Sequence, residues 1–352
     1  MKIKCSNYNI LINDWQRLLE LVSSDKYSSV IIIVDENTKK YCLPIFNKKI
    51  KDDIKIIEIV SGEVNKTLTT CQIIWDMMLS YSVDRHSLCI NLGGGVIGDM
   101  GGFVASTFMR GMDFVQIPTT LLSQVDASVG GKLGVDYHDY KNMIGIIREP
   151  TAVFIFTEFL DTLPMAQLRS GYAEVIKHWL ISDKEGFDTY KYANLKDHDW
   201  NNIIVESVKL KKKITDSDPL ERGVRKILNF GHTLGHAIES YNLSSTLPLL
   251  HGEAIAIGMI LETHLSYQNN SDNITIADID HVAKSLILIF GHHPGMIPPL
   301  SILIAKMKFD KKNKSGKIKF SLLNSIGDCT YDIEVNEAMI SKAVDYYKEL
   351  KT

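Results

Sequence analysis

A glycine-rich turn follows one of the apolar runs in the first half of the chain. Residues 93–99 read GGGVIGD, directly after Leu88–Leu92, and contain the spacing G-x-G-x-x-G. Glycines let the backbone approach a phosphate closely, and the N–H groups at the start of a helix stabilise its negative charge. The segment is therefore a candidate phosphate or dinucleotide site, and a tightly packed strand-to-helix turn is the alternative.

The position of this turn limits the dinucleotide interpretation. It follows the third predicted strand, whereas the usual dinucleotide fingerprint follows the first strand and is itself followed by an acidic residue. Asp35, which ends the first predicted strand, is a possible ribose ligand instead.

A second candidate is a set of polar side chains spaced along a predicted helical segment. At about 100° per residue, spacings of four, three and four place them on one side of a helix. This pattern predicts a metal or anion site, although a solvated helix face would look the same. The glycines at positions 231 and 235 lower helix stability without an evident packing reason, which favours function. The four residues are Arg225, Asn229, His232 and His236.

Two more polar positions belong to apolar helical segments. Glu174 and Lys177 lie one turn apart and form either a carboxylate ligand beside an anion-binding amine or an ordinary surface pair. His251 begins another apolar segment, as a helix cap or as a ligand. Spacing alone also allows His232 and His236 to bind zinc as an H-x-x-x-H pair. The residues by themselves leave the ligand set open.

The elements that must position these side chains change character near the middle of the chain. Short β-branched runs in the first half predict buried strands and a mainly parallel sheet. From about Thr162, helical periodicity dominates. The predicted strands are Val30–Val34, Lys55–Val60, Leu88–Leu92, Phe114–Ile117 and Ala152–Phe156, and the predicted helices are Gln167–Ser182, Trp200–Thr215, Leu228–Ser240, His251–Tyr267 and Ile276–Phe290.

This pattern predicts an α/β domain over residues 1–161 and a mostly α-helical domain over residues 162–352. A late exception is a hairpin of Lys317–Leu323 and Cys329–Glu334 around the turn at Gly327.

Composition excludes several classes of protein. The 352 residues are 45% hydrophobic and 23% charged, as expected for two globular domains. The 39 basic and 42 acidic residues give a net charge of −3, so no overall field attracts nucleic acid or acidic lipid. Any anion must therefore be bound locally.

The cysteines and the apolar segments indicate a cytoplasmic protein. The five cysteines are scattered and show no close pairs, which fits a reducing compartment. The N-terminal residues have no continuous apolar core before Asp14, so we expect no signal peptide. The most apolar later stretch, Ala254–Leu261, is too short to span a bilayer.

Taken together, these segments resemble the 3-dehydroquinate synthase family, part of the sugar-phosphate cyclase superfamily, over nearly the whole chain. The matching blocks follow the order of that family. They are GGGVIGD at 93–99, MRG at 109–111, PTTLLSQVDASVGGK at 118–132, KNMIG at 141–145, AEVIK at 173–177, LNFGHTLGH at 228–236, HGE at 251–253 and DKK at 310–312.

The resemblance implies an N-terminal α/β domain that binds NAD, a helical C-terminal domain that binds metal, and an active site in the cleft between them. Its zinc (or cobalt) ligands are expected at Glu174, His232 and His251, which leaves His236 to contact substrate. One carboxylate and two imidazoles with an open position are what a catalytic zinc requires.

The resemblance also assigns residues to the two small-molecule sites. Expected NAD contacts are Asp35, Glu63, Lys66, Gly94, Gly95, Val96, Ile97, Gly98, Asp99, Thr119, Thr120, Lys132, Lys141, Phe159 and Thr162. Expected substrate contacts are Asp126, Lys132, Asn142, Lys177, Lys211, Arg225, Asn229 and His236. Within these, Lys132, Asn142, His236 and Arg110 are expected to bind phosphate, together with Lys311 or Lys312, and Lys211 and Arg225 to bind a carboxylate.

The implied reaction is a phosphate-eliminating, carbocycle-forming lyase step of the shikimate pathway of aromatic amino acid biosynthesis. It converts 3-deoxy-D-arabino-heptulosonate 7-phosphate to 3-dehydroquinate and phosphate. The family's chemistry has zinc polarise a ring hydroxyl, while NAD removes a hydride and later returns it. Net redox is therefore zero. The implied assembly is a homodimer in which Arg110 reaches the neighbouring chain's phosphate site.

Two other functions compete with this interpretation. Another sugar-phosphate cyclase, acting on a neutral sugar phosphate, would have no carboxylate for Lys211 and Arg225 to bind. A metal-dependent alcohol dehydrogenase of the glycerol dehydrogenase kind would release NADH and would not need the phosphate ligands. The chain also departs from the family at Leu133, where threonine is expected, and at Asp136, where asparagine is common.

Overall fold

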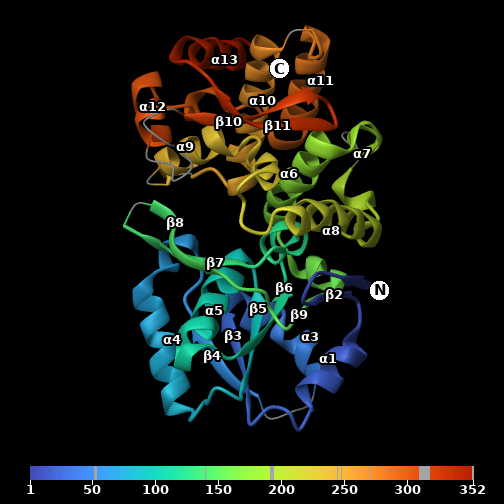
Figure 1. Cartoon of the computed structure of the whole chain (residues 1–352), viewed down its shortest axis with the longest axis vertical. Coiled ribbons are helices and arrows are strands. Elements are labelled where there is room, and N and C mark those ends of the chain that lie inside the picture. Colours follow the sequence, from blue (N-terminus) through green and yellow to red (C-terminus); the bar gives the residue numbers. More distant parts are fainter. Residues whose placement is uncertain are drawn as a thin grey trace. The chain divides into compact units, whose positions relative to one another are not determined.

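The computed structural model describes residues 1–50, 54–138, 140–190, 194–243, 245–246, 248–270, 272–308 and 318–350, with the backbone alone at 140 and 190. These residues form two compact units (Figure 1). Unit 1 is Met1–Leu168 with Trp200–Lys212, and unit 2 is Arg169–Asp199 with Lys213–Thr352. The chain therefore passes between the units three times, twice within a long helix and once just before the second of these helices. The expected domain boundary after residue 161 stays a prediction.

Unit 1 is built on a seven-stranded sheet in the order β1-β2-β9-β6-β5-β3-β4. All neighbouring strands are parallel except β1 and β2. The five predicted strands and the mainly parallel sheet are confirmed, whereas β1 and β2 were not predicted. The strands are β1 (Lys2–Lys4), β2 (Asn9–Ile12), β3 (Val30–Asp35), β4 (Lys55–Ile59), β5 (Leu88–Gly93), β6 (Asp113–Pro118) and β9 (Ala152–Ile155).

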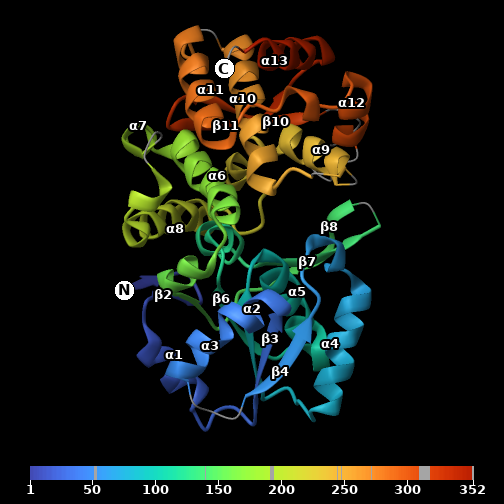
Figure 2. The same ribbon diagram turned by 180° about the vertical axis from the view of Figure 1, so that it is seen from behind.

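Helices cover both faces of this sheet (Figure 2). Alternate side chains of β3 point into two separate cores, one with α1 and α3 and one with α4 and α5. Burial on both faces explains why the strands are continuous apolar runs. The helices are α1 (Trp15–Val22), α2 (Glu36–Tyr41), α3 (Leu43–Lys49), α4 (Leu68–Ser80) and α5 (Gly95–Thr107), with short helical turns η1 (Glu63–Asn65), η2 (Phe108–Arg110), η3 (Ser123–Ala127) and η4 (Thr157–Thr162).

The strand order reverses between β3 and β5. After β3 the chain runs to β4 at the sheet edge, and it then returns to the other side of β3 to form β5 and β6. In open parallel sheets, ligands bind at the carboxyl ends of the strands at such a reversal. Asp35 and the glycine turn end these two strands, so the topology places both at the expected binding edge.

A separate hairpin of β7 (Lys132–Tyr137) and β8 (Tyr140–Ile147) lies against α5 and was not predicted. The hairpin and the helix pack closely because α5 carries glycine at position 102. A Cβ atom there would overlap the Leu133 side chain. Leu133, one of the two departures from the family pattern, is thus a core residue that fills the space over a glycine.

Unit 2 is mostly helical, as expected, and carries the predicted late hairpin. Its helices are α6 (Met165–Ser182), α7 (Lys184–Tyr190), α8 (Trp200–Ser217), α9 (His232–Asn242), α10 (His251–Asn269), α11 (Ile276–Phe290), α12 (Leu300–Lys308) and α13 (Glu337–Glu349), with α6 and α8 shared with unit 1. The hairpin is β10 (Lys319–Ser325) with β11 (Asp328–Glu334), and the short turns are η5 (Leu195–Asp197), η6 (Val224–Asn229) and η7 (Pro294–Met296).

The helix predicted over Leu228–Ser240 is wrong at its start. η6 ends at Asn229, and α9 begins at His232 after Gly231, which has φ 78°. This left-handed conformation interrupts the helix, and glycine adopts it without strain. Arg225 and Asn229 therefore do not share one helix face with His232 and His236.

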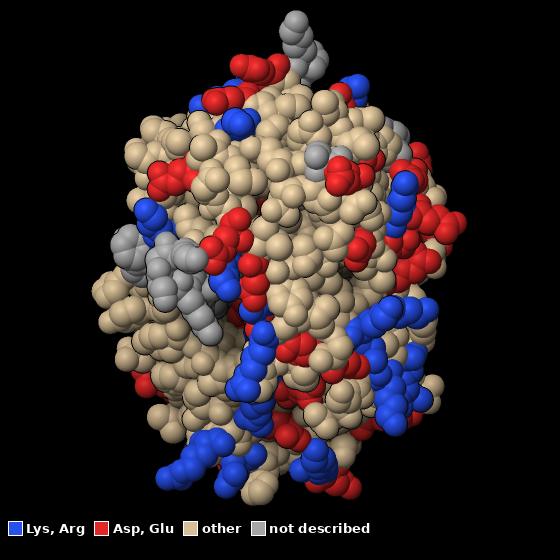
Figure 3. Space-filling model, turned by 45° about the horizontal axis from the view of Figure 1, so that its top comes forward, with Lys and Arg blue, Asp and Glu red and all other residues tan. Residues whose placement is uncertain are grey.

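Basic and acidic side chains are both spread over the face of the molecule drawn in Figure 3, in keeping with the small net charge. Across the part of the chain that the structure covers, no helix is both long enough and apolar enough to pass through a membrane.

We predict that Leu133→Thr destabilises unit 1. Leu133 is 7% exposed, so the change removes apolar volume and buries a hydroxyl, which costs about 1–3 kcal/mol in the free energy of unfolding. Urea unfolding followed by tryptophan fluorescence measures the loss. Met143→Thr in the same hairpin is the control, because Met143 is 45% exposed. Equal stability of the two variants would contradict the packing role of Leu133.

Candidate functional site

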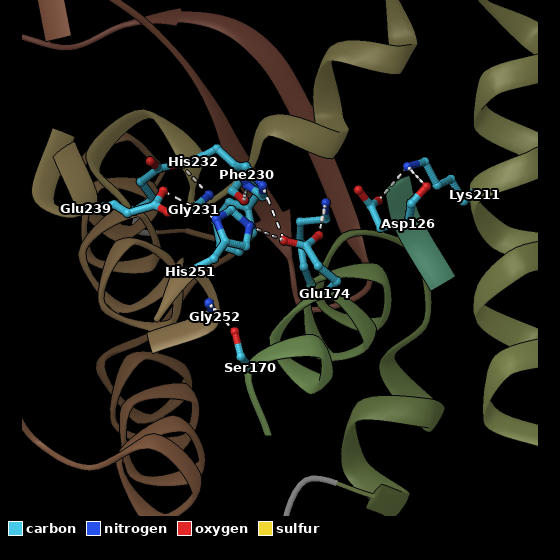
Figure 4. A network of polar contacts seen from close by, with 12 residues as sticks. Asp126, Ser170, Glu174, Lys211, Phe230, Gly231, His232, Glu239, His251 and Gly252 are labelled. Atoms are coloured by element: carbon cyan, nitrogen blue, oxygen red, sulfur yellow. Dashed lines mark hydrogen bonds and ion pairs between the residues drawn. The ribbon is translucent and has the colours of Figure 1, made fainter. Parts of the chain in front are cut away.

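Three potential metal ligands converge in unit 2 (Figure 4). Glu174 lies on α6, and His232 and His251 are the first residues of α9 and α10. The Glu174 Oε1 atom lies 3.3 Å from Nε2 of His232 and 3.4 Å from Nε2 of His251. All three ligand atoms lie within 4.8 Å of one another. Sequence spacing alone could not bring together residues on three different helices.

The second ring nitrogen of each histidine has its own acceptor. Nδ1 of His232 lies 3.0 Å from the Phe230 carbonyl oxygen, and Nδ1 of His251 lies 3.3 Å from Oε2 of Glu239. Because these oxygens accept hydrogen bonds, each Nδ1 carries a hydrogen, and each Nε2, which faces Glu174, is the nitrogen that would bind a metal. This is the usual orientation of histidines that bind zinc. The donor set therefore fits a divalent metal.

Charge compensation inside this cluster is strong. Glu174 is fully buried, and the buried Lys177 ammonium forms an ion pair with its Oε2 atom. Burial alone would raise the pKa of Glu174, but Lys177 and His232 hold it well below its usual value. Burial lowers the pKa of His232, and for His251 the nearby Glu239 and Glu174 outweigh burial and raise the pKa to about 10. A bound cation would take the place of that proton.

A second group of donors shares His251. His236, Glu239 and His251 also bring ligand atoms within 4.8 Å of one another. The His236 ring centroid lies 5.0 Å from that of His232 and 5.9 Å from that of His251. When Glu174, His232 and His251 are the ligands, Glu239 accepts a hydrogen bond from His251 and therefore orients that ligand. Sequence reasoning missed Glu239, although its position three residues after His236 was a signal, since it places both on one helix face.

The helices that carry Glu174 and His251 are held together by close packing, a hydrogen bond and an ion pair. The Gly252 N–H donates to the Ser170 hydroxyl at 2.9 Å, and a Cβ atom at Gly252 would overlap the Ser170 carbonyl oxygen. Arg169 adds an ion pair with Glu253 at 2.9 Å. The start of α10 is therefore fixed against α6, and this contact sets where His251 lies relative to Glu174.

The two other polar residues of the predicted stripe lie on η6. Arg225 is 2% exposed, and its Nη1 atom donates to the Pro219 carbonyl oxygen at 2.7 Å. Asn229 donates to Oε1 of Glu221 at 3.0 Å. Both side chains are thus held by hydrogen bonds to residues of the segment that precedes α9.

In unit 1 the glycine turn is where the topology predicts a ligand. Gly94 caps α5 without a side chain, and a Cβ atom on it would lie 3.1 Å from Cγ2 of Thr120. The Thr119 N–H donates to the Gly93 carbonyl oxygen at 3.0 Å, which joins the ends of β5 and β6. The open N–H groups at the start of α5 form a suitable anion site. Asp35 caps α2 beside it and accepts from the Thr38 N–H at 2.7 Å.

A buried lysine connects several predicted NAD and substrate residues. Lys66 is 3% exposed, and its Nζ atom lies 2.6 Å from both Oδ2 of Asp99 and Oδ1 of Asn142. Burial lowers the pKa of Lys66, but Asp99 and Glu63 outweigh it, and the pKa is raised. Asp136 accepts from the Asn142 N–H at 2.7 Å, while its own N–H donates to the Lys66 carbonyl oxygen at 2.9 Å. Asp136 thus supports the position of Asn142.

Asp126 and Lys211 form a second polar pair in unit 1 (Figure 4). Nζ of Lys211 lies 2.7 Å from the Asp126 carboxylate and donates to its carbonyl oxygen at 2.6 Å. Asp126 belongs to the π-helical turn η3, a conformation often found at functional sites.

The remaining predicted residues of unit 1 contribute in different ways. Nζ of Lys141 lies 3.7 Å from Oε1 of Glu63. Thr162 donates to the Phe159 carbonyl oxygen at 2.7 Å. The Phe159 ring is fully buried and packs edge-on against Trp15. Of the other predicted residues, Lys132 is exposed at the start of β7, Val96 and Gly98 are half-buried in the first turn of α5, and Ile97 is buried there.

Arg110 lies in an exposed, strained turn after α5. Met109 and Arg110 have φ of 47° and 67°, and Gly111 has φ 110°. Non-glycine residues rarely adopt such angles, and the residues that do are concentrated at functional sites. Arg110 lines a surface pocket of about 490 Å³ that also includes Lys26, Arg85 and Arg148. Lys311 and Lys312, the other predicted phosphate ligands, lie outside the described residues.

Sequence comparison gives the chain close relatives over nearly its full length. The pattern of the 3-dehydroquinate synthase N-terminal domain matches residues 56–170, and that of the C-terminal domain matches residues 171–313. The 3-dehydroquinate synthase of Parabacteroides distasonis is 37% identical over 349 residues, which cover 94% of this chain and 95% of that protein. The one from Leptospira interrogans is 39% identical over 341 residues, which cover 94% and 91%.

Solved structures share the fold. A 2-deoxy-scyllo-inosose synthase complexed with carbaglucose-6-phosphate, NAD+ and Co2+ is 22% identical with a TM-score of 0.83, covering 98% of this chain and 99% of that one. A 2-epi-5-epi-valiolone synthase from Streptomyces hygroscopicus with NAD+ and Zn2+ bound is 25% identical with a TM-score of 0.82, covering 99% and 98%. A probable glycerol dehydrogenase from Sinorhizobium meliloti is 13% identical with a TM-score of 0.60, covering 98% and 97%.

The fold and the donor cluster define a protein of the dehydroquinate synthase-like class, in which a parallel α/β unit is joined to a helical unit. Within that class, the sequence relatives decide more than the fold does, because several different enzymes share the fold. The chain belongs to the 3-dehydroquinate synthase family.

We predict that the ligand set of Glu174, His232 and His251 can be separated from His236 by metal analysis. His251→Ala removes a ligand and should lower bound zinc to less than about a tenth of the wild-type amount, whereas His236→Ala should keep most of it. His264→Ala, further along α10, is the control for loss of a histidine from that helix. An empty His236→Ala variant beside a loaded Glu174→Ala variant would instead support the H-x-x-x-H pair.

Proposed function

We propose that the chain is a 3-dehydroquinate synthase that converts 3-deoxy-D-arabino-heptulosonate 7-phosphate to 3-dehydroquinate and phosphate. The reaction is a lyase step of aromatic amino acid biosynthesis, and it uses catalytic NAD and a divalent metal. The observation that supports it most is the convergence of Glu174, His232 and His251 in a chain of this family. The distribution of cationic side chains supports the choice of substrate.

The residues of unit 2 bind the metal and hold charge beside it. Glu174, His232 and His251 hold the metal, which when bound supplies Lewis acidity toward a substrate hydroxyl. Lys177 forms an ion pair with Glu174 and offers its ammonium group to an anionic substrate. His236 lies next to two ligands, where it contacts the substrate phosphate.

The residues of unit 1 would hold NAD, which when bound would supply reversible hydride transfer without net oxidation. The N–H groups at the start of α5 bind the pyrophosphate, and Asp35 accepts from a ribose hydroxyl. The other NAD contacts are Glu63, Lys66, Gly94 to Asp99, Thr119, Thr120, Lys132, Lys141, Phe159 and Thr162.

Two kinds of anionic group on the substrate account for the cationic residues. Lys132, Asn142, His236 and Arg110 bind the phosphate. Lys211 and Arg225 bind the carboxylate, for which the guanidinium of Arg225 has the matching planar geometry. Because a neutral sugar phosphate has no carboxylate, these two residues favour the heptulosonate as the substrate. Asp126 orients Lys211, and Asn229 lies on the same turn as Arg225.

We predict that the purified protein, supplied with NAD and Zn2+ or Co2+, releases phosphate from the heptulosonate phosphate without accumulating NADH. The hydride returns within each turnover, so NADH absorbance should stay flat while phosphate rises. Chelation by EDTA, followed by restoring metal, is the control for metal dependence. Stoichiometric NADH would indicate a dehydrogenase, and activity only on sedoheptulose 7-phosphate would indicate another cyclase.

We further propose that the protein is a homodimer in which Arg110 reaches the phosphate bound by the neighbouring chain. The turn that carries Arg110 is exposed and strained, as expected of a residue held out for an external contact. The single acidic residue of its pocket, Asp113, pairs with Lys26 at 2.7 Å, so the surroundings of Arg110 stay cationic.

We place the protein in the cytoplasm, because its five cysteines form no disulfide.

We predict complementation between two inactive variants. Arg110→Ala and Lys177→Ala should each lose nearly all activity. Mixed dimers should recover it, because one of their two sites combines an intact Lys177 with an intact Arg110. An equal mixture should reach roughly a quarter of wild-type activity, since half of the dimers are mixed and each has one complete site. Failure to rise, despite subunit exchange shown by native mass spectrometry, would place Arg110 outside the neighbouring chain's site.

A further inference from the structure

A buried carboxylate that has no role in the proposed reaction lies behind the metal ligands. Glu262 is on α10, one turn after Gly258, and it is fully buried. Its Oε2 atom accepts from the Gly231 N–H at 2.6 Å, and its Oε1 atom accepts from the Leu234 N–H at 3.0 Å. These two amides flank His232 at the start of α9.

Helix α9 has no cap of its own. Gly231 occupies the N-cap position and has no side chain to accept from the first turn. A larger residue there would be strained, because φ is 78°, and its Cβ atom would lie 2.5 Å from Cγ of Met259. The acceptor must therefore come from another element. A carboxylate suits the position, since the amino-terminal end of a helix carries partial positive charge.

The same two helices meet backbone to backbone beside this cap. A Cβ atom at Gly258 would overlap the Gly231 carbonyl oxygen and would lie 2.8 Å from the Gly235 nitrogen. The first turn of α9 thus rests on α10 without an intervening side chain. The Glu262 carboxylate accepts hydrogen bonds from two backbone N–H groups of that turn, and His232 lies between the two residues that donate them.

We infer that Glu262 is a positioning residue for the metal ligand His232. It is not one of the three proposed ligands, and both of its carboxylate oxygens accept from backbone N–H groups. It fixes the Gly231 backbone between Phe230, whose carbonyl orients the His232 ring, and the first turn of α9. Loss of the cap lets this turn shift, and the Nε2 atom of His232 then leaves its place beside Glu174. The inference rests on the metal role proposed above for Glu174, His232 and His251.

Glu262→Gln tests the inference, because it keeps the size of the side chain and replaces one acceptor oxygen by an NH2 group. That group cannot accept from an amide N–H, so one of the two hydrogen bonds is lost. The metal-free variant is titrated with Co2+, and visible absorption reports both affinity and coordination geometry. We expect the dissociation constant to rise about ten- to hundredfold, as for other partners of metal ligands, with a changed Co2+ spectrum.

Asp278→Asn is the matched control. Asp278 caps α11 in the same unit by accepting from the Thr275 N–H at 2.9 Å, and α11 carries none of the three ligands. We expect its thermal stability to fall while its Co2+ affinity stays within about twofold of wild type, as expected of a loss of helix capping alone. A Glu262→Gln variant that folds and binds Co2+ with wild-type affinity and spectrum would overturn the inference.

A measurement on the unaltered protein covers the case in which Glu262→Gln does not fold. In metal-free wild type, hydrogen exchange should be slow at the Gly231 and Leu234 amides, because Glu262 holds this turn before metal arrives. Rapid exchange there, beside protected amides later in α9, would contradict the inference. If wild type itself binds no Co2+, the proposed metal role fails first, which distinguishes the two failures.

Discussion

The need to compensate a buried carboxylate governs the construction of unit 2. Glu174 has no contact with solvent, and an isolated charge in an apolar interior costs many kcal/mol. Lys177 offsets part of this cost from the next turn of the same helix, and two histidines approach from the other side. The cluster is polar, fully packed and complete only when three helices meet. Glu239 and Glu174 outweigh burial and raise the pKa of His251 to about 10, and the same negative charge favours a bound cation.

The two units present polar groups in different ways. Unit 1 uses the ends of parallel strands, where the backbone itself supplies donors and the glycines keep it accessible. Its side chains then brace one another, as Lys66 does between Asp99 and Asn142. Unit 2 instead uses side chains on three different helices, so its donors depend on how those helices pack. Geometry in unit 1 follows from sheet topology, and geometry in unit 2 follows from close helix contacts.

The sequence alone predicted a strand or helix correctly where the element's own environment sets its pattern of apolar and polar residues. Continuous apolar runs predicted the central strands, because both sheet faces are covered, and the long helices of unit 2 followed from their periodicity. The strands β1 and β2 are short, and the hairpin β7–β8 mixes glycine and polar residues, so none of these gave a clear period. The helix break was missed because the left-handed conformation of Gly231, where the backbone lies close to α10, leaves no mark in the apolar periodicity. The family resemblance placed Glu174 and His251 with His232, whereas spacing along α9 favoured His236. The roles of Glu239 and Glu262 needed the packed structure.

The backbone contact between Gly231 and Gly258 also affects how this site can change over time. Neither position can gain a side chain alone, because a Cβ atom at Gly258 would overlap the Gly231 carbonyl oxygen, and one at Gly231 would overlap the Met259 side chain. A mutation at one would need a matching change in the other helix, and no single intermediate would keep the helices at this distance. The segments that carry His232 and His251 are therefore physically coupled through this contact. A chimaera that takes α9 from one relative and α10 from a more distant one would risk losing the site even with every ligand in place.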